Sequence, residues 1–137
     1  MNLVVFLGSN RGDDSAGHEC YKKAISRINA RLIFLGTDIF EIFRKYENEK
    51  KVIVVDAFYG AEDIIHLKND EIFKLESRSE HAHYISPVEA LKILNEIGFS
   101  PKELHLIGIP AKSFDKITYT DEIIEKAIKK VEEILVL

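Results

Sequence analysis

The sequence predicts a single α/β domain spanning residues 1–137, a three-layer sandwich in which a mostly parallel or mixed five-stranded sheet carries helices on both faces. Short apolar runs alternate with stretches of helical periodicity along the whole chain, a pattern typical of such sheets. The length of 137 residues is that of one ordinary domain. No internal repeat, linker or low-complexity stretch divides the sequence.

The first half of the chain is expected to alternate strand and helix. The run LVVFL at residues 3–7 is apolar throughout, as strands buried on both faces of a parallel sheet are. An amphipathic helix is predicted at residues 15–30, because small and apolar side chains recur there every four positions. A strand at residues 31–36 and a short helix at residues 38–46 follow. The run VIVV at residues 52–55 is the expected central strand, ending at Asp56.

The second half adds a candidate strand at residues 64–67, an irregular segment at residues 75–86, and a helix after it. Ser86 can cap that helix, Pro87 suits its first turn, and Gly98 ends it. The remaining elements are a strand at residues 103–109 and a last helix capped by Thr120. The predicted order is thus βαβαβ(β)αβα.

Composition excludes several classes of protein. The 46% hydrophobic and 31% charged residues fit a soluble globular protein without a membrane span, and the net charge of −4 argues against nucleic acid as the main ligand. A single cysteine, Cys20, rules out an internal disulfide and a Cys-based zinc site. Residues 1–7 lack a basic segment and are interpreted as strand rather than signal peptide, so a cytoplasmic location is expected. Abundant Lys, Glu and Ile favour a heat-tolerant source.

Ligands of such sheets bind at the carboxyl ends of the strands, near a topological switch point. Four segments follow or face these ends: residues 8–17 (GSNRGDDSAG), 56–60 (DAFYG), 80–83 (EHAH) and 110–115 (PAKSFD). We expect several of these loops to share one edge of the sheet.

The first of these loops has two simple interpretations. A glycine-rich turn that leads into a helix often cradles a phosphate, but its glycines fit neither GxGxxG nor the P-loop pattern. Asp13 and Asp14 also place two negative charges where a phosphate would lie. Alternatively, either aspartate caps the following helix. One carboxylate suffices for that role, so the second is left unexplained.

Asp56 directly ends an apolar strand, where burial of a carboxylate is unfavourable unless the group is paired. It is either hydrogen-bonded to a nearby loop N–H or is a functional carboxylate held on a rigid strand. His81 and His83 lie in a polar loop, where a histidine is usually solvated. His18, His66 and His105 fall within helices or strands, and Cys20 lies on an apolar helix face.

Two carboxylates and one histidine from three strand-end loops would form an oxygen-and-nitrogen site suited to nickel, zinc, manganese or iron. The sequence contains neither HExxH nor GxSxG, which argues against an ordinary metalloprotease and against a serine hydrolase elbow.

Taken in order, these loops resemble those of the hydrogenase maturation endopeptidases, along nearly the whole chain. The resemblance is carried by Gly8, Asn10 and the Asp13–Asp14 pair, by Asp56-Ala57 with Gly60, by His83 ahead of PVEAL at residues 87–91, and by LIGIP with Ser113 at the late strand and turn.

The resemblance implies that the chain removes the C-terminal extension of a nickel-loaded nickel–iron hydrogenase large-subunit precursor. Asp14, Asp56 and His83 then take the metal-contacting and catalytic positions, as in an aspartyl-type protease, with His81 as an alternative to His83. The nickel belongs to the precursor, and zinc or cadmium can substitute for it in vitro. The precursor is the expected partner of a monomeric protein that binds neither nucleic acid nor membrane. The alternative is a non-proteolytic α/β module that binds a nucleotide or a metal-bearing partner.

Overall fold

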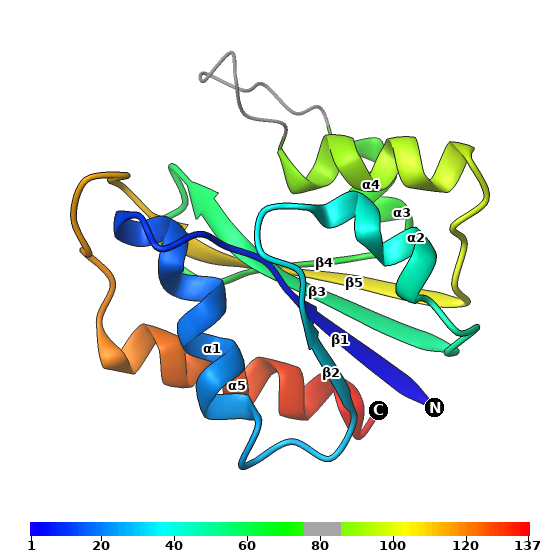
Figure 1. Ribbon diagram of the computed structural model, residues 1–137, viewed down its shortest axis with the longest axis horizontal. Helices are drawn as coiled ribbons and strands as arrows, with labels where there is room; N and C mark the ends of the chain where they lie inside the picture. The colour runs from blue at the N-terminus through cyan, green and yellow to red at the C-terminus, as the bar shows by residue number, and fades with distance from the viewer. Residues whose placement is uncertain (76–85) are drawn as a thin grey trace.

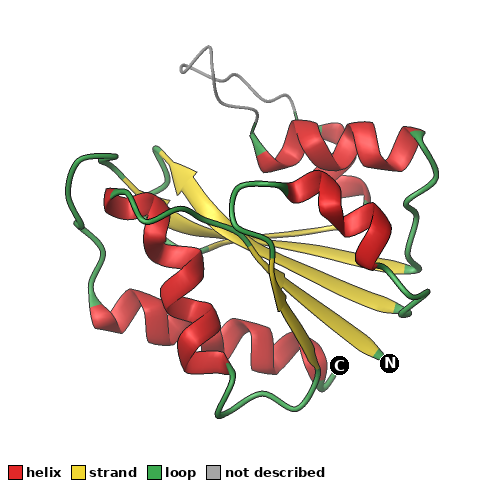
Figure 2. Ribbon diagram, in the orientation of Figure 1, coloured by secondary structure: helices red, strands yellow, loops and turns green. Residues whose placement is uncertain are grey.

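A five-stranded sheet lies between two layers of helices in the computed structural model, which describes residues 1–75 and 86–137 (Figure 1, Figure 2). The strand order is β2-β1-β3-β5-β4, with β4 antiparallel to β5 and the other pairings parallel. The strands are β1 (Asn2–Phe6), β2 (Arg31–Phe34), β3 (Lys51–Tyr59), β4 (Ile65–Lys68) and β5 (Glu103–Ala111). This confirms the predicted fold class.

The helices divide between the two faces. One face carries α1 (Ala16–Ala24) and α5 (Asp121–Leu135), and the other carries α2 (Ile42–Lys45), α3 (Asp70–Lys74) and α4 (Pro87–Glu96), as Figure 1 shows. Two 3₁₀ turns, η1 (Gly12–Ser15) and η2 (Ile39–Glu41), precede α1 and α2. No helix among the described residues combines the length and apolar character that crossing a bilayer requires.

Each face of the sheet has its own hydrophobic core, which explains the unbroken apolar runs. Leu3 and Val5 of β1 pack with α2 and α4, whereas Val4 and Phe6 pack with α1 and α5. All four side chains are fully buried, as both faces of the central strands are covered. The side chain of Cys20 is buried in the core between the sheet and helices α1 and α5, as its place on the apolar helix face predicts.

Helix starts at α4 and α5 follow the sequence signals. The hydroxyl of Ser86 accepts from the Glu89 N–H at 3.2 Å, and that of Thr120 accepts from the Ile123 N–H at 3.2 Å. Both contacts satisfy an otherwise unpaired helix N–H.

Several boundaries differ from the prediction. β3 does not end at Asp56 but runs to Tyr59, and β5 reaches Ala111, because the two strands stay paired over their full length. The first helix ends at Ala24 rather than at residue 30, since the chain must turn before it enters β2. The five-residue helix α3 was not predicted, as it is too short to show a helical period. The expected irregular segment lies almost entirely outside the described residues.

The strand order creates a topological switch point between β1 and β3. From β1 the chain crosses to β2 at one edge, and from β3 it continues toward β4 and β5 at the other. The segments that leave the carboxyl ends of β1 and β3 therefore diverge, which opens space for a ligand between them.

Close packing of α1 against the end of β1 depends on Gly17. A Cβ at this position would lie 1.8 Å from the carbonyl oxygen of Leu7, so only glycine allows the helix to approach the strand this closely. The approach brings the η1 turn over the carboxyl end of the sheet.

We expect Gly17→Ala to lower the free energy of unfolding by about 3 kcal/mol, because backbone on both sides of the contact would have to move. Urea denaturation would measure the change, with Lys23→Ala on the exposed side of the same helix as the control. Equal stability of both variants would contradict the close approach.

Candidate active site

Asp56 is held on the central strand of the sheet. Its backbone pairs with Gly108 of β5, and its side chain is only 7% exposed. One carboxylate oxygen, Oδ1, accepts from the Ala57 N–H at 2.8 Å. Burial, with a further contribution from the nearby Asp14 carboxylate, raises the pKa of Asp56 to about 8, although the Ala57 N–H opposes the shift. The side chain therefore holds its proton at neutral pH.

Asp14 reaches the same place from the η1 turn after β1. Its side chain is 5% exposed, and its Oδ2 accepts from the Ser9 N–H at 3.1 Å. Neither Asp14 nor Asp13 makes a side-chain cap at η1 or α1, so the capping interpretation of this pair is wrong. The reason is that both carboxylates turn away from the helix end, toward different neighbours.

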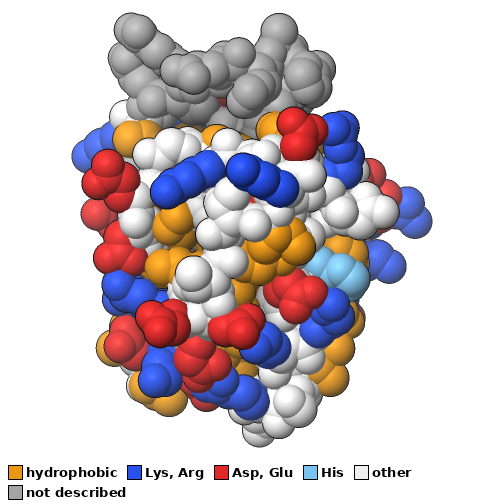
Figure 3. All heavy atoms as spheres, turned by 90° about the vertical axis from the view of Figure 1, so that its left-hand side faces the viewer, with side chains coloured by type: hydrophobic (Ala, Val, Ile, Leu, Met, Phe, Trp, Pro, Cys, Tyr) orange, Lys and Arg blue, Asp and Glu red, His pale blue; other side chains and the backbone are white. Residues whose placement is uncertain are grey.

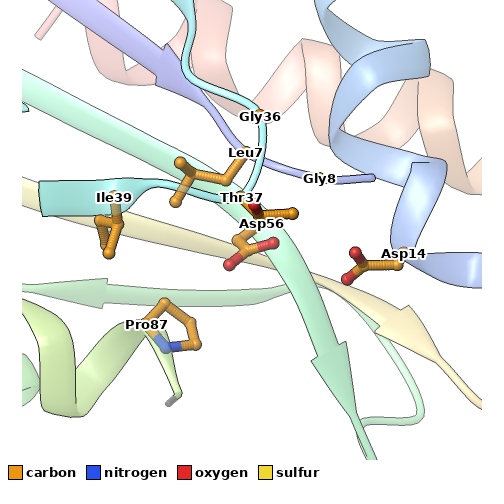
Figure 4. A pocket seen from close by; sticks show the side chains of 8 residues that line it. All are labelled: Leu7, Gly8, Asp14, Gly36, Thr37, Ile39, Asp56 and Pro87. Carbon is orange, nitrogen blue, oxygen red and sulfur yellow. The ribbon is translucent and has the colours of Figure 1, made fainter. Parts of the chain in front are cut away.

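The two carboxylates line one small pocket of about 50 Å³ at the switch point, and Figure 4 shows both directed into the space between them. A volume of that size admits an ion or a few water molecules. The lining residues come from the connections after β1 and β2, from β3 and from the start of α4: Leu7, Gly8, Asp14, Gly36, Thr37, Ile39, Asp56 and Pro87. Acidic groups on one side thus face apolar walls on the other.

Sequence patterns alone did not single out some of these residues. Thr37 follows the end of β2, so the same rule that selected the other strand-end loops would have found it. Ile39 and Pro87 could not be recognised as site residues, because a sequence does not distinguish an apolar residue that lines a pocket from one in the hydrophobic core. Pro87 matters for a different reason: it places the start of α4 at the pocket.

The remaining candidates divide into two groups. His83 and His81 lie outside the described residues, so their expected place at the site stays a prediction. His18 stacks on Phe34 at a centroid distance of 4.5 Å, and His66 and His105 bond to each other at 2.9 Å. These histidines have structural partners, as their positions within helices and strands indicated.

Phosphate binding by the first loop is disfavoured by its hydrogen bonds. Four N–H groups of this loop donate to backbone carbonyl oxygens: Gly8 to Gly36, Ser9 to Asp14, Asp13 to Ser113, and Asp14 to Arg11. A nucleotide cradle needs such N–H groups directed at the ligand. The loop instead uses them to hold its own shape.

The surface at the carboxyl edge of the sheet carries both signs of charge. Figure 3 looks at the molecule from the left-hand side of Figure 1, toward which the arrowhead of β3 points, and shows acidic and basic side chains intermingled around apolar groups. A mixed surface of this kind suits a protein partner better than a uniformly charged polymer.

The fold and the paired carboxylates define an α/β protein with an acidic, cation-compatible pocket at its topological switch point. Comparison with known proteins gives the particular family. A sequence model described as "Hydrogenase maturation protease" matches residues 16–136, most of the chain. The chain therefore belongs to the hydrogenase maturation protease family, and it is a hydrolase of the endopeptidase class.

Individual relatives agree with this assignment. Protein FrxA from Pyrococcus furiosus is 34% identical over 129 residues, which cover 90% of this chain and 93% of FrxA. The [NiFe] hydrogenase maturation protease HybD from Thermococcus kodakarensis superposes with a TM-score of 0.75 at 28% identity, covering 97% of both chains. The HybD endopeptidase from E. coli shares the fold, with a TM-score of 0.71 at 23% identity over 98% of this chain and 91% of its own.

We expect Asp56→Asn to stabilise the protein, because the amide keeps an oxygen for the Ala57 N–H but never ionises. The raised pKa makes the folded wild type bind a proton that the unfolded chain releases above about pH 4. Wild-type stability should therefore fall between about pH 4 and pH 8, relative to the variant. Near pH 8 the variant should be more stable by roughly 1–3 kcal/mol.

Urea denaturation at pH 4.5, 6 and 8 would measure this difference. Asp115→Asn, at a carboxylate with a 92% exposed side chain, is the matched control and should leave stability unchanged. An Asp56→Asn variant that is less stable than wild type at pH 8 would contradict the buried, protonated carboxyl.

Proposed function

We propose that the protein removes the C-terminal extension from a nickel–iron hydrogenase large-subunit precursor after nickel has been inserted. Asp14, Asp56 and His83 contact the nickel that the precursor carries. The observation that supports this most is the pair of buried carboxylates directed into one pocket at the switch point. The related HybD of Thermococcus kodakarensis is a [NiFe] hydrogenase maturation protease.

A divalent cation suits this pair on electrostatic grounds. Two carboxylates that share a small, buried pocket repel each other when both are charged. A cation between them reverses the balance, because it stabilises both charged forms. Carboxylate oxygens together with an imidazole nitrogen suit nickel, zinc, manganese or iron, and the identity of nickel comes from the family rather than from the donor set.

His83 is the proposed third ligand because of where α4 begins. Pro87 lines the pocket, and His83 precedes it by four residues in the sequence. Four residues span at most about 14 Å, so this spacing in the sequence is short enough for the imidazole to reach the two carboxylates. His81, two residues further away, is the alternative.

The same groups would carry the peptide-bond hydrolysis. Cleavage requires a base to take a proton from the attacking water and an acid to protonate the departing amine. With the cation bound, one carboxylate of the pair can take the proton from the water and then pass the same proton to the departing amine, so that a single group serves first as base and then as acid. Binding of nickel on the precursor would polarise the reacting groups.

Asp14→Asn, Asp56→Asn and His83→Ala should each lower precursor trimming by at least about a hundredfold, since each removes a ligand or a proton-transfer group. The readout is the mass of a purified, nickel-loaded precursor after incubation with enzyme. His81→Ala separates the two histidines and should retain activity, and Asp115→Asn is the surface control. Full trimming by both Asp56→Asn and His83→Ala would overturn the proposal.

Binding of cadmium or nickel to the free protein should weaken as the pH falls from 8 to 6.5. Below its pKa of about 8, Asp56 must lose its proton before it can act as a ligand. The apparent affinity should therefore fall by up to about tenfold per pH unit, with close to one proton released per ion. Calorimetry in buffers of different ionisation enthalpy measures both quantities.

In the same titration, the Asp56→Asn variant should bind the metal ion more weakly than wild type at pH 8. Its affinity should no longer depend on Asp56 losing a proton between pH 6.5 and pH 8. Affinity that is independent of pH in the wild type would exclude a protonated Asp56 as a ligand.

A further inference from the structure

The neighbour of Asp14 in sequence, Asp13, is fully buried and points away from the pocket. Its Oδ2 accepts from the Lys112 N–H at 2.7 Å and the Ser113 N–H at 3.1 Å, both in the segment that follows β5. The backbone N–H and the hydroxyl of Thr118 also donate to this carboxylate. One side chain thus gathers four donors that lie about a hundred residues away in the sequence.

These donors keep Asp13 ionised in spite of its burial. Burial by itself would raise the pKa of this carboxyl group, but the hydrogen bonds from Thr118, Lys112 and Ser113 hold it below the usual value. A charged, fully hydrogen-bonded carboxylate of this kind resists displacement, because any movement breaks several hydrogen bonds at once and leaves the buried carboxylate short of donors.

The rest of the η1 turn is fastened to the same segment. The Asp13 N–H donates to the Ser113 carbonyl oxygen at 2.8 Å, and Ser15 Oγ bonds to Tyr119 Oη at 2.7 Å. Gly12, with φ of +49°, lies so close that a Cβ there would be 2.5 Å from the Phe114 carbonyl carbon. Residues on both sides of Asp14 are therefore held by residues 112–119.

Successive side chains of a 3₁₀ turn point about 120° apart around its axis. Once Asp13 is fixed toward residues 112–118, the direction of Asp14 is fixed as well, and it is the direction of Asp56. We infer that Asp13 is a positioning residue: its contacts with Lys112, Ser113 and Thr118 hold the Asp14 carboxylate in the pocket. This inference rests on the proposed function only in giving Asp14 a catalytic or metal-contacting role.

The contact requires a carboxylate rather than an amide, because every group that faces Asp13 is a donor. In Asp13→Asn, an amide oxygen that keeps the Lys112 and Ser113 N–H groups would leave the amide NH₂ facing the Thr118 N–H. Two donors would then oppose each other in a buried site. The turn should shift, and a displacement of about 1 Å at a reacting group can lower a rate about a hundredfold.

The test compares Asp13→Asn and Thr118→Val with Thr118→Ser and with Glu96→Gln, an exposed position in α4, at a temperature where each protein is fully folded. We expect kcat for precursor trimming to fall about thirty- to a hundredfold in Asp13→Asn and three- to tenfold in Thr118→Val, with KM within about twofold of wild type. The Thr118→Ser variant keeps the hydroxyl and should trim the precursor at the wild-type rate. If Asp13→Asn does not fold, the two Thr118 variants decide.

Cadmium affinity provides a readout that does not depend on the precursor. Asp13→Asn should weaken binding about tenfold in the wild-type background and have no further effect once Asp14 is already Asn, since it acts through that residue. A purely structural role would lower the melting temperature without changing kcat or cadmium affinity of the folded protein, and would overturn the inference. Full trimming by Asp14→Asn would instead refute the proposed function, so the two failures are distinguishable.

Discussion

A carboxylate on a buried strand is the constraint around which the pocket is arranged. Asp56 cannot leave its position, because β3 is paired on both sides and its neighbours in sequence are buried. Within residues 1–75 and 86–137, its side chain is hydrogen-bonded only to the adjacent Ala57 N–H. A group in this state is unfavourable for stability, and it persists where function needs it.

The remaining parts of the site are brought to Asp56 by contacts that are distant in sequence. Gly17 allows α1 to lie against the end of β1, which places η1 above the sheet. Asp13 then fastens η1 to the segment after β5, and Asp14 turns toward the pocket. The two adjacent aspartates differ in their surroundings: Asp13 accepts hydrogen bonds from four donors and is held in place, whereas Asp14 accepts one from the Ser9 N–H and lines the pocket.

The sequence predicted what depends on local pattern and chemistry. Apolar runs with no polar interruption indicated the central strands, and an acidic residue directly after one of them singled out Asp56. The role of Asp13 could not be predicted from the sequence, because its partners in residues 112–118 become its neighbours only when β1 and β5 have joined one sheet. The extension of β3 to Tyr59 was missed for a related reason: strand length is set by pairing with β5, which no local pattern records. His83 stays a prediction.

The state of Asp56 also bears on how the site could respond to the correct substrate. While the carboxyl group keeps its proton, the pocket holds less negative charge and attracts free cations less strongly. Under the proposed function, a cation delivered by a docked precursor would arrive at high local concentration and would displace that proton. Binding of the ion would therefore be linked to loss of the Asp56 proton. The buried position of Asp56, unfavourable for folding, would in this way favour metal that is presented on the substrate over metal in solution.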